Sequence, residues 1–407
     1  MTSEVGPPVV TASVLTGKRI LFGVTGSIAA FKAAGWVREL CAESAGVTVV
    51  MTRAAERFVS SLTFGALSGN PVYGNMFDED PDRLMAHINL SREADCILIA
   101  PATARTIARL AHGMADDLLS TVVLAAKIPV VVCPAMNSNM LSHPATRRNL
   151  RQLQELGYHV VSPDTGMLAC GEEGAGRLPE WEFVHETLLR LFSAPDLAGK
   201  KIVITAGPTR EPLDPARFLS NRSSGKMGHA LAKTAARRGA EVVLVSGPVA
   251  LADPPGINTI HVTTAAEMHE QVFEFARDAD IVVKAAAVAD FKPKTYQEQK
   301  IKKSSAEPLI ELEKTLDILA ELGEARRPGL LLVGFAAESR DHEQEGFRKL
   351  KQKNTDLIVV NDILGEATGF DVETNQVILV DRSGSRRLPL LSKVDTANRI
   401  WDHVLTL

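Results

Sequence analysis

Three side chains in the first half of the chain have the chemistry of an active site. Cys170 lies in the glycine-rich segment 168–177, which predicts an exposed loop for this thiol. Asn137 follows an apolar run, and its amide can donate and accept hydrogen bonds. His87 can exchange a proton near neutral pH. A thiol, an amide and an imidazole suit proton transfer to a substrate, although a lone histidine is more often structural.

A second group of polar residues follows the strands predicted in the second half. The segment 220–228 is rich in hydroxyl groups and glycine, and we expect a helix to begin near Lys226. The N–H groups of a helix N-terminus favour a phosphate. Lys349 and Lys353 are four residues apart and share a face of a predicted helix, although single lysines are usually solvated. Neither a P-loop nor the G-x-G-x-x-G pattern is present, which disfavours kinases and dehydrogenases.

Each half begins with a basic and then apolar run that leads into a glycine turn. Residues 17–24 run into Thr25-Gly26-Ser27, and residues 199–204 run into 205–209. Such a run is typical of the first buried strand of a parallel sheet. Further apolar runs alternate with helical patterns: 47–51, 96–100, 130–133 and 159–161, then 241–245, 281–283, 330–333 and 357–360. We predict two doubly wound, Rossmann-like three-layer α/β domains with ligands at the carboxyl ends of the strands.

The length and composition set the domain count and the compartment. The chain has 407 residues, which at about 150 per domain permits two or three domains. We expect a disordered arm over residues 1–16, a first domain over 17–193 and a second over 197–407, with a linker at 192–196. None of the four cysteines forms a C-x-x-C pair, so we expect neither zinc nor disulfides, and a reducing cytoplasm.

Charge and hydropathy exclude several classes of partner. The net charge is −4, so no bulk positive field attracts nucleic acid or an anionic membrane. No apolar run reaches the ~18 residues that a membrane span needs. The first residues lack the pattern of a signal peptide. We therefore expect small-molecule partners, no nucleic acid and no membrane.

The motifs of the first half resemble the phosphopantothenoylcysteine decarboxylases, which are FMN-dependent members of the flavoprotein family of cysteine decarboxylases. The resemblance covers roughly residues 18–190, and it rests on the segments 26–30, 86–90, 134–137 and 169–172. It implies a flavodoxin-like domain with FMN as cofactor. The residues implied to bind FMN are Gly26, Ser27, Thr52, Pro101, Ala102 and Thr103.

The resemblance also implies roles for the polar residues of this half. A substrate thiol would be oxidised to a thioaldehyde, the adjacent carboxylate would leave as CO2, and the resulting ene-thiolate would be reduced and protonated. His87 would act as a base or orienting donor, and Asn137 would hold the carboxylate. Cys170 would protonate the ene-thiolate. Met140 would contact the substrate, with core packing as its alternative.

The second half resembles phosphopantothenate–cysteine ligase, whose product is the substrate of the decarboxylase. The resemblance covers roughly residues 200–407, and the segment 220–228 carries it. It implies a ligase domain in which CTP activates the carboxylate of 4′-phosphopantothenate as an acyl-cytidylate, which the amine of cysteine then attacks. A divalent cation, Mg2+ or Mn2+, would neutralise the polyphosphate, with Asp290 as its candidate ligand.

The ligase resemblance assigns a set of site residues. Asn221 would hold the acyl-cytidylate, and Arg217 would help its conversion to product. Many relatives have Asn-Pro-Asp where this chain has Thr315-Leu316-Asp317, which leaves Asp317 as the candidate side chain there. The residues implied to contact CTP are Asp290, Lys300, Leu316, Asp317, Ile318, Leu319, Phe335, Lys349 and Lys353.

The two resemblances together imply a homo-oligomer. The flavin half would form trimers with FMN at a subunit interface, and the ligase half would form dimers, which gives a dodecamer. One alternative is a scaffold protein that kept the flavin fold without catalysis; His87, Asn137 and Cys170 together disfavour it. Another alternative is a decarboxylase of peptidyl cysteine, which the fused ligase half disfavours.

Overall fold

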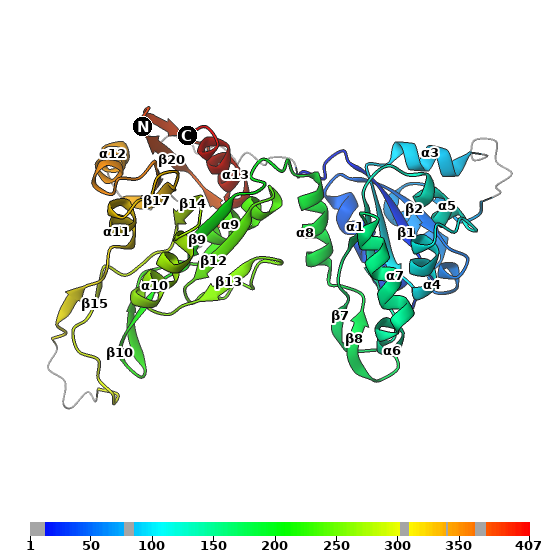
Figure 1. The fold of residues 1–407 in the computed structure, drawn as a ribbon, viewed down its shortest axis with the longest axis horizontal. Coiled ribbons are helices and arrows are strands. Elements are labelled where there is room, and N and C mark those ends of the chain that lie inside the picture. The colour runs from blue at the N-terminus through cyan, green and yellow to red at the C-terminus, as the bar shows by residue number, and fades with distance from the viewer. Residues whose placement is uncertain (1–12, 77–84, 302–308, 339–340, 363–371) are drawn as a thin grey trace. The chain divides into compact units, whose positions relative to one another are not determined.

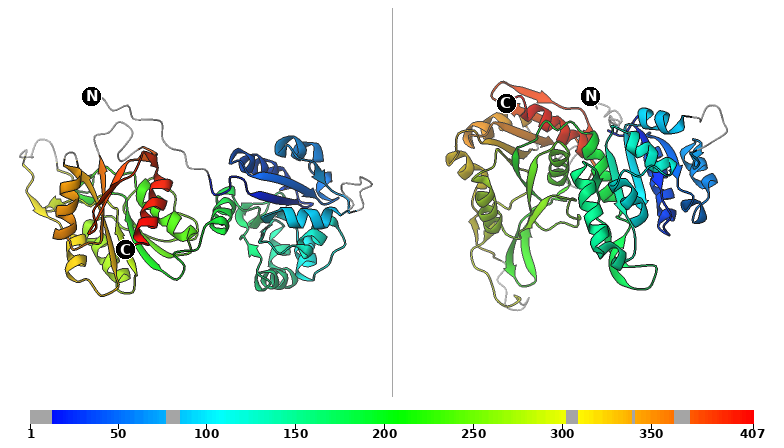
Figure 2. Two further views of the ribbon diagram at one scale, coloured as in Figure 1. Left: turned by 90° about the horizontal axis from the view of Figure 1, so that it is seen from above. Right: turned by 45° about the vertical axis from the view of Figure 1, so that its right-hand side comes forward.

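The computed structural model describes residues 13–76, 85–301, 309–338, 341–362 and 372–407. These residues form two compact units, which divide between Phe192 and Ser193 (Figures 1 and 2). Both units are doubly wound α/β structures. In the part of the chain that the structure describes, no helix is long and apolar enough to cross a membrane.

The first unit is a parallel sheet with helices on both faces. Its helices are α1 Ala30–Ala42, the 3-10 turn η1 Ala55–Arg57, α2 Ser61–Ser68, α3 Ala86–Glu93, α4 Ala104–Ala111, α5 Leu118–Ala125, α6 Ser138–Ser142, α7 Pro144–Glu155 and α8 Trp181–Phe192. Its strands are β1 Arg19–Val24, β2 Gly46–Met51, β3 Val72–Tyr73, β4 Cys96–Ala102, β5 Val130–Pro134, β6 His159–Val160, β7 Asp164–Met167 and β8 Glu173–Arg177.

The strand order of this sheet is β3-β2-β1-β4-β5-β6, with every pairing parallel. This is the Rossmann order. Without the two-residue edge strand β3, the remaining five strands follow the flavodoxin-like order. The order reverses between β1 and β4, so the crevice for a ligand is expected at their carboxyl ends.

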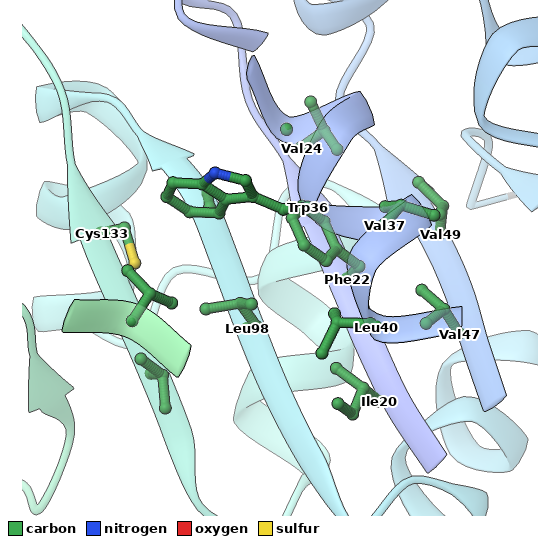
Figure 3. Close-up of a cluster of buried hydrophobic side chains, with 14 of the residues drawn as sticks. Ile20, Phe22, Val24, Trp36, Val37, Leu40, Val47, Val49, Leu98 and Cys133 are labelled. Carbon is green, nitrogen blue, oxygen red and sulfur yellow. The ribbon is translucent and has the colours of Figure 1, made fainter. Parts of the chain in front are cut away.

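Two apolar clusters sandwich the first sheet. Trp36, Val37 and Leu40 of α1 pack with Phe22 and Val49 on one face, together with residues of α8 (Figure 3). Helices α3, α4, α5 and α7 cover the other face. Every residue of β4 is buried, as expected for a central parallel strand covered on both sides. The prediction of three layers is therefore confirmed for this unit.

The second unit repeats this plan with a larger sheet. Its helices are α9 Lys226–Arg237, α10 Ala265–Ala276, α11 Ile318–Glu324, α12 His342–Gln352 and α13 Lys393–Val404. Its strands are β9 Lys201–Ala206, β10 Arg210–Asp214, β11 Arg217–Ser220, β12 Glu241–Ser246, β13 Asn258–His261, β14 Ile281–Lys284, β15 Phe291–Pro293, β16 Leu312–Lys314, β17 Leu331–Glu338, β18 Leu357–Asp362, β19 Thr374–Asn375, β20 Val377–Asp381, β21 Ser385–Arg387 and β22 Leu391–Ser392.

The second sheet runs β13-β12-β9-β14-β17-β18-β20-β21. The first six strands are parallel in the Rossmann order, and β20 and β21 add an antiparallel edge. Helices α9 and α13 cover one face, and α10 and α11 cover the other, with α12 beside β18 and β20. The order reverses between β9 and β14, which places the second crevice there.

Some boundaries differ from the sequence-based expectation. Strand β4 runs to Ala102 and β17 runs to Glu338, because each stays paired with its neighbour beyond the apolar run. Residues 1–12 of the expected arm lie outside the described residues. The arm prediction is wrong for its last part, because Leu15 is fully buried in the first core.

Candidate active sites

The carboxyl edge of the first sheet brings the residues predicted to bind FMN together. The Thr25 hydroxyl, after β1, donates to the Pro101 carbonyl over 2.6 Å and accepts from the Thr103 N–H over 3.1 Å. This joins the turn with Gly26 and Ser27 to the loop after β4. The Thr52 N–H donates to the Val24 carbonyl over 3.0 Å, which places Thr52 at the same edge.

The donors at this edge fit a phosphate. The N-cap of α1, Ala29, makes no side-chain capping bond, and the first turn carries no acidic residue. The Ser27 hydroxyl lies 3.3 Å from the Ala29 N–H. A helix N-terminus without acidic side chains favours an anion. The residues predicted to hold FMN thus offer hydrogen-bond donors that suit its phosphate.

The β7–β8 hairpin carries Cys170 next to Asn137. The hairpin is tied to the loop after β5, because the Met136 N–H donates to the Gly176 carbonyl over 2.9 Å. The Asn137 Nδ2 atom lies 3.5 Å from Cys170 Sγ and 3.2 Å from Glu172 Oε2. The Cys170 thiol also faces Glu172 Oε2 at 3.6 Å. A thiol, an amide and a carboxylate therefore meet on the hairpin.

The environment distinguishes Cys170 from the other cysteines. Cys96 and Cys133 are buried, as predicted, and Cys41 is half-buried, whereas Cys170 is exposed. Burial raises the pKa of Cys96 to about 12 and also raises the pKa of Cys133 and Cys41. Met140 on α6 is exposed, so core packing does not explain it.

His87 lies apart from this group within one chain. It is half-buried on α3. Figure 1 shows α3 and the β7–β8 hairpin at opposite ends of the first unit. Among the described residues, no hydrogen bond or ion pair links His87 to Asn137 or Cys170. A single chain does not assemble the three predicted catalytic groups.

The second sheet has a similar junction where β9 and β14 end. The Thr205 hydroxyl accepts from the Ala286 N–H over 3.0 Å, and the Thr209 hydroxyl accepts from the Ala289 N–H over 3.0 Å. The Ala287 N–H donates to the Gly207 carbonyl over 2.9 Å. Thr205 thus joins β9 to the loop after β14, much as Thr25 joins the turn after β1 to the loop after β4.

A cavity of about 770 Å3 opens at this junction. The first turn of α9 lines it, and the N-cap Gly225 makes no side-chain capping hydrogen bond. The Asn221 Nδ2 atom donates to the Val288 carbonyl over 2.9 Å. The predicted site residues that line the cavity are Asn221, Asp290, Leu316, Asp317, Ile318, Leu319, Phe335, Lys349 and Lys353.

Lys349 and Lys353, the two lysines predicted to share a helix face, both form ion pairs. Lys349 pairs with Glu338 at 2.6 Å, and Lys353, the C-cap of α12, pairs with Asp317. Asp317 also caps α11 by accepting from the Ala320 N–H over 3.0 Å. Burial alone would raise the pKa of Asp317, but these hydrogen bonds outweigh it and hold that pKa below its usual value.

Arg217 and Lys300 do not line the cavity. Two guanidinium nitrogens of Arg217 bind Asp214 at 2.9 and 2.6 Å, and its Nη2 atom donates to the Ile301 carbonyl over 3.1 Å. The hydrogen bond from Arg217 holds the pKa of Asp214 well below its usual range. Lys300 is exposed and directly precedes Ile301. Arg217 and the Lys300 segment therefore meet at Asp214 rather than in the cavity.

Two residues of these sites, Thr25 and Lys284, were not predicted from the sequence. Thr25 belongs to a turn whose sequence does not single it out, although Thr205 lies near the end of the matching strand of the other half. Lys284 was not predicted because the predicted strand stopped at Val283; a lysine that directly follows a buried apolar run was the sequence signal that could have identified it.

Among the described residues, no group of three or more His, Cys, Asp or Glu side chains could hold a metal ion.

Comparison with known proteins covers both units. The family model of the DNA/pantothenate metabolism flavoprotein C-terminal domain matches residues 197–407, and the Flavoprotein family model matches residues 10–193. The coenzyme A biosynthesis bifunctional protein CoaBC of Bacillus subtilis (strain 168) is 46% identical over 399 residues, with 97% of this chain and 98% of that protein covered. The protein of the same name from Vibrio vulnificus (strain YJ016) is 45% identical over 395 residues, with 97% and 98% covered.

The fold, the two sheet edges and these matches define a two-domain α/β flavoprotein. The chain belongs to the family of coenzyme A biosynthesis bifunctional proteins.

Proposed function

We propose that the chain catalyses two consecutive steps of coenzyme A biosynthesis. The unit over 197–407 condenses 4′-phosphopantothenate with cysteine at the expense of CTP. The unit over 17–193 decarboxylates the product, 4′-phospho-N-pantothenoylcysteine, to 4′-phosphopantetheine with FMN. The observation that carries the proposal is the pair of ligand edges, one per sheet, each of which collects residues suited to one of the two reactions.

In the flavin unit, the protein's own groups bind, orient and protonate. FMN, when bound, supplies the two-electron oxidation of the substrate thiol and later returns two electrons. The first turn of α1 and Ser27 hold its phosphate, and Thr52 and Pro101–Thr103 hold the rest of it. Asn137 holds the substrate carboxylate until it leaves as CO2, and Met140 contacts the substrate. Cys170 gives its thiol proton to the ene-thiolate.

In the ligase unit, the cavity holds the nucleotide during two displacements. The carboxylate of 4′-phosphopantothenate attacks the α-phosphorus of CTP and releases pyrophosphate. The amine of cysteine then attacks the acyl carbon and releases CMP. Asn221, fixed by Val288, holds the acyl-cytidylate. Lys349 and Lys353 exchange their carboxylate partners for the nucleotide, a charge-assisted contact.

Arg217 and Lys300 act from the edge of this site. They meet at Asp214 outside the cavity lining, so they reach substrate after the segments around them move or from another subunit. Asp290 would hold Mg2+ or Mn2+ jointly with CTP, and the cation would offset the charge of the phosphates. Such sharing is usual for Mg2+ at nucleotides and needs no protein cluster.

The proposed assembly is a homo-oligomer in which the flavin site lies between subunits. The separation of His87 from Cys170 within one chain supports this, because a second copy can supply the missing imidazole. We propose trimers through the flavin unit, dimers through the ligase unit and hence a dodecamer. The four free cysteines suit a reducing cytoplasm.

The flavin half of the proposal is tested by the bound cofactor. The purified protein should be yellow and release FMN on denaturation. A colourless protein that does not take up FMN would rule out the decarboxylase reaction.

A further inference from the structure

Lys284 ends β14 and is one of two buried lysines that line the second cavity, the other being Lys393. Its backbone pairs with Thr205 on β9 and with Gly334 on β17. Only 9% of the residue is exposed, yet it lines the cavity. Side chains two apart on a strand share a face, so Lys284 lies on the face of Val282, which packs with Ile318 of α11.

The ammonium group of Lys284 keeps its donors free. Among the described residues, no hydrogen bond or ion pair engages it, in contrast to Lys349 and Lys353. A lysine has three N–H donors and no acceptor, so its partner must be an acceptor. Because Lys284 lines the cavity, a ligand bound there can supply that acceptor.

Two carboxylates face Lys284 from the cavity wall. Burial lowers the pKa of Lys284 to about 8, and the charges of Asp317 and Asp290 oppose that lowering. A phosphate next to Lys284 would therefore also face Asp317, and it would need the cation proposed at Asp290 to offset the second carboxylate. A neutral acceptor gains the hydrogen bond without this repulsion, so the electrostatics favour an uncharged part of the ligand.

The surroundings of Lys284 suit a flat ring. A Cβ atom at its register partner Gly334 would lie 2.6 Å from Leu319 Cδ2 and 2.8 Å from Ile358 Cδ1. Leu319 and Ile358 also line the cavity, so apolar groups lie beside the strand position of Lys284. Few polar groups among apolar neighbours are typical of a ring-binding pocket.

The first turn of α9 is a second part of the cavity and is suited to phosphates. Helix α9 packs on the opposite face of the sheet, where a Cβ atom at Gly228 would lie 2.5 Å from Ala206 Cβ. A nucleotide that crosses the sheet edge can thus place its phosphates at the first turn of α9 and its base at Lys284.

We propose that Lys284 determines the choice of nucleotide base by donating a hydrogen bond to the O2–N3 edge of cytosine. The inference rests on the proposed use of CTP. Cytosine presents two adjacent acceptors, O2 and N3, whereas uracil carries an N–H at position 3. An ammonium group placed between these positions binds cytosine and disfavours uracil.

Calorimetric titration of the full-length protein with CTP, UTP and pyrophosphate tests the assignment. K284M should weaken CTP binding about tenfold or more, as expected for a hydrogen bond to a charged group. The loss for UTP and for pyrophosphate should be smaller than the loss for CTP, because both lack the adjacent O2 and N3 acceptors of cytosine and lose only the longer-range attraction of the charge. K351M removes an exposed lysine of α12 outside the cavity and should change none of the three affinities.

A second variant separates the base contact from a structural role. K284Q keeps an N–H donor and adds an acceptor, so it should bind CTP better than K284M and bind UTP at least as well as the unmodified protein. Flavin content and melting temperature report folding. Equal losses for CTP, UTP and pyrophosphate, or no loss at all, would overturn the assignment. If the unmodified protein bound pyrophosphate but not CTP, the proposed function itself would fail instead.

Discussion

The side-chain amide of Asn137 and the thiol of Cys170 are 3.5 Å apart, although 33 positions separate them in the sequence. The β7–β8 hairpin makes this possible, because it folds back on the loop after β5. The pair places a proton donor next to a group that can hold a carboxylate. The first prediction addresses the thiol.

Cys170→Ser should leave the flavin bound but stop the reaction after CO2 has left. A serine hydroxyl is far less acidic than a thiol, so it does not protonate the ene-thiolate at a comparable rate. Mass spectrometry should find the unreduced ene-thiol product in place of 4′-phosphopantetheine. Cys41→Ser alters a half-buried cysteine of α1 and should leave turnover intact. Normal turnover by Cys170→Ser would disprove the proton-donor role.

A mixture of two inactive variants tests whether the flavin site lies between subunits. His87→Asn and Cys170→Ser should each lose decarboxylation when alone. Coexpression in equal amounts should restore about a quarter of the activity, since a site with the unmodified histidine from one copy and cysteine from another forms with that probability. If no activity returned in the mixed oligomers, both residues would have to act within one chain.

Asn221→Asp should impair ligation and spare decarboxylation. An aspartate cannot donate to the Val288 carbonyl, and its charge repels both that carbonyl and the phosphate of an acyl-cytidylate. We expect at least about a tenfold loss in ligation, measured as pyrophosphate release. Decarboxylation of added 4′-phospho-N-pantothenoylcysteine should stay unchanged. Loss of both activities together would contradict the assignment of one reaction to each unit.

The sequence predicted the fold well because its signals are local. Apolar runs such as that of β4, and the start of α9 at Lys226, follow from residues next to one another. The end of β17 was harder to predict, since Phe335–Glu338 stay in the sheet through pairing with β18, which lies later in the chain.

The site was predictable where a motif identified it and not where spatial contacts define it. Asn221 and Cys170 came from motifs. Lys284 looked like the end of an ordinary strand, because its lack of a partner depends on where Asp317 and Asp290 lie in space. The distance of His87 from Cys170 depends on the order of the strands, which the sequence does not state directly.

The central claim is that one chain performs two consecutive reactions, and one product analysis tests it most directly. The purified protein, loaded with FMN, is incubated with 4′-phosphopantothenate, cysteine, CTP and Mg2+, and the products are identified by mass spectrometry. We predict 4′-phosphopantetheine, CMP, pyrophosphate and CO2, with none of them formed when CTP is omitted. Failure to form 4′-phospho-N-pantothenoylcysteine or any later product, by a protein that binds FMN and CTP, would contradict the account.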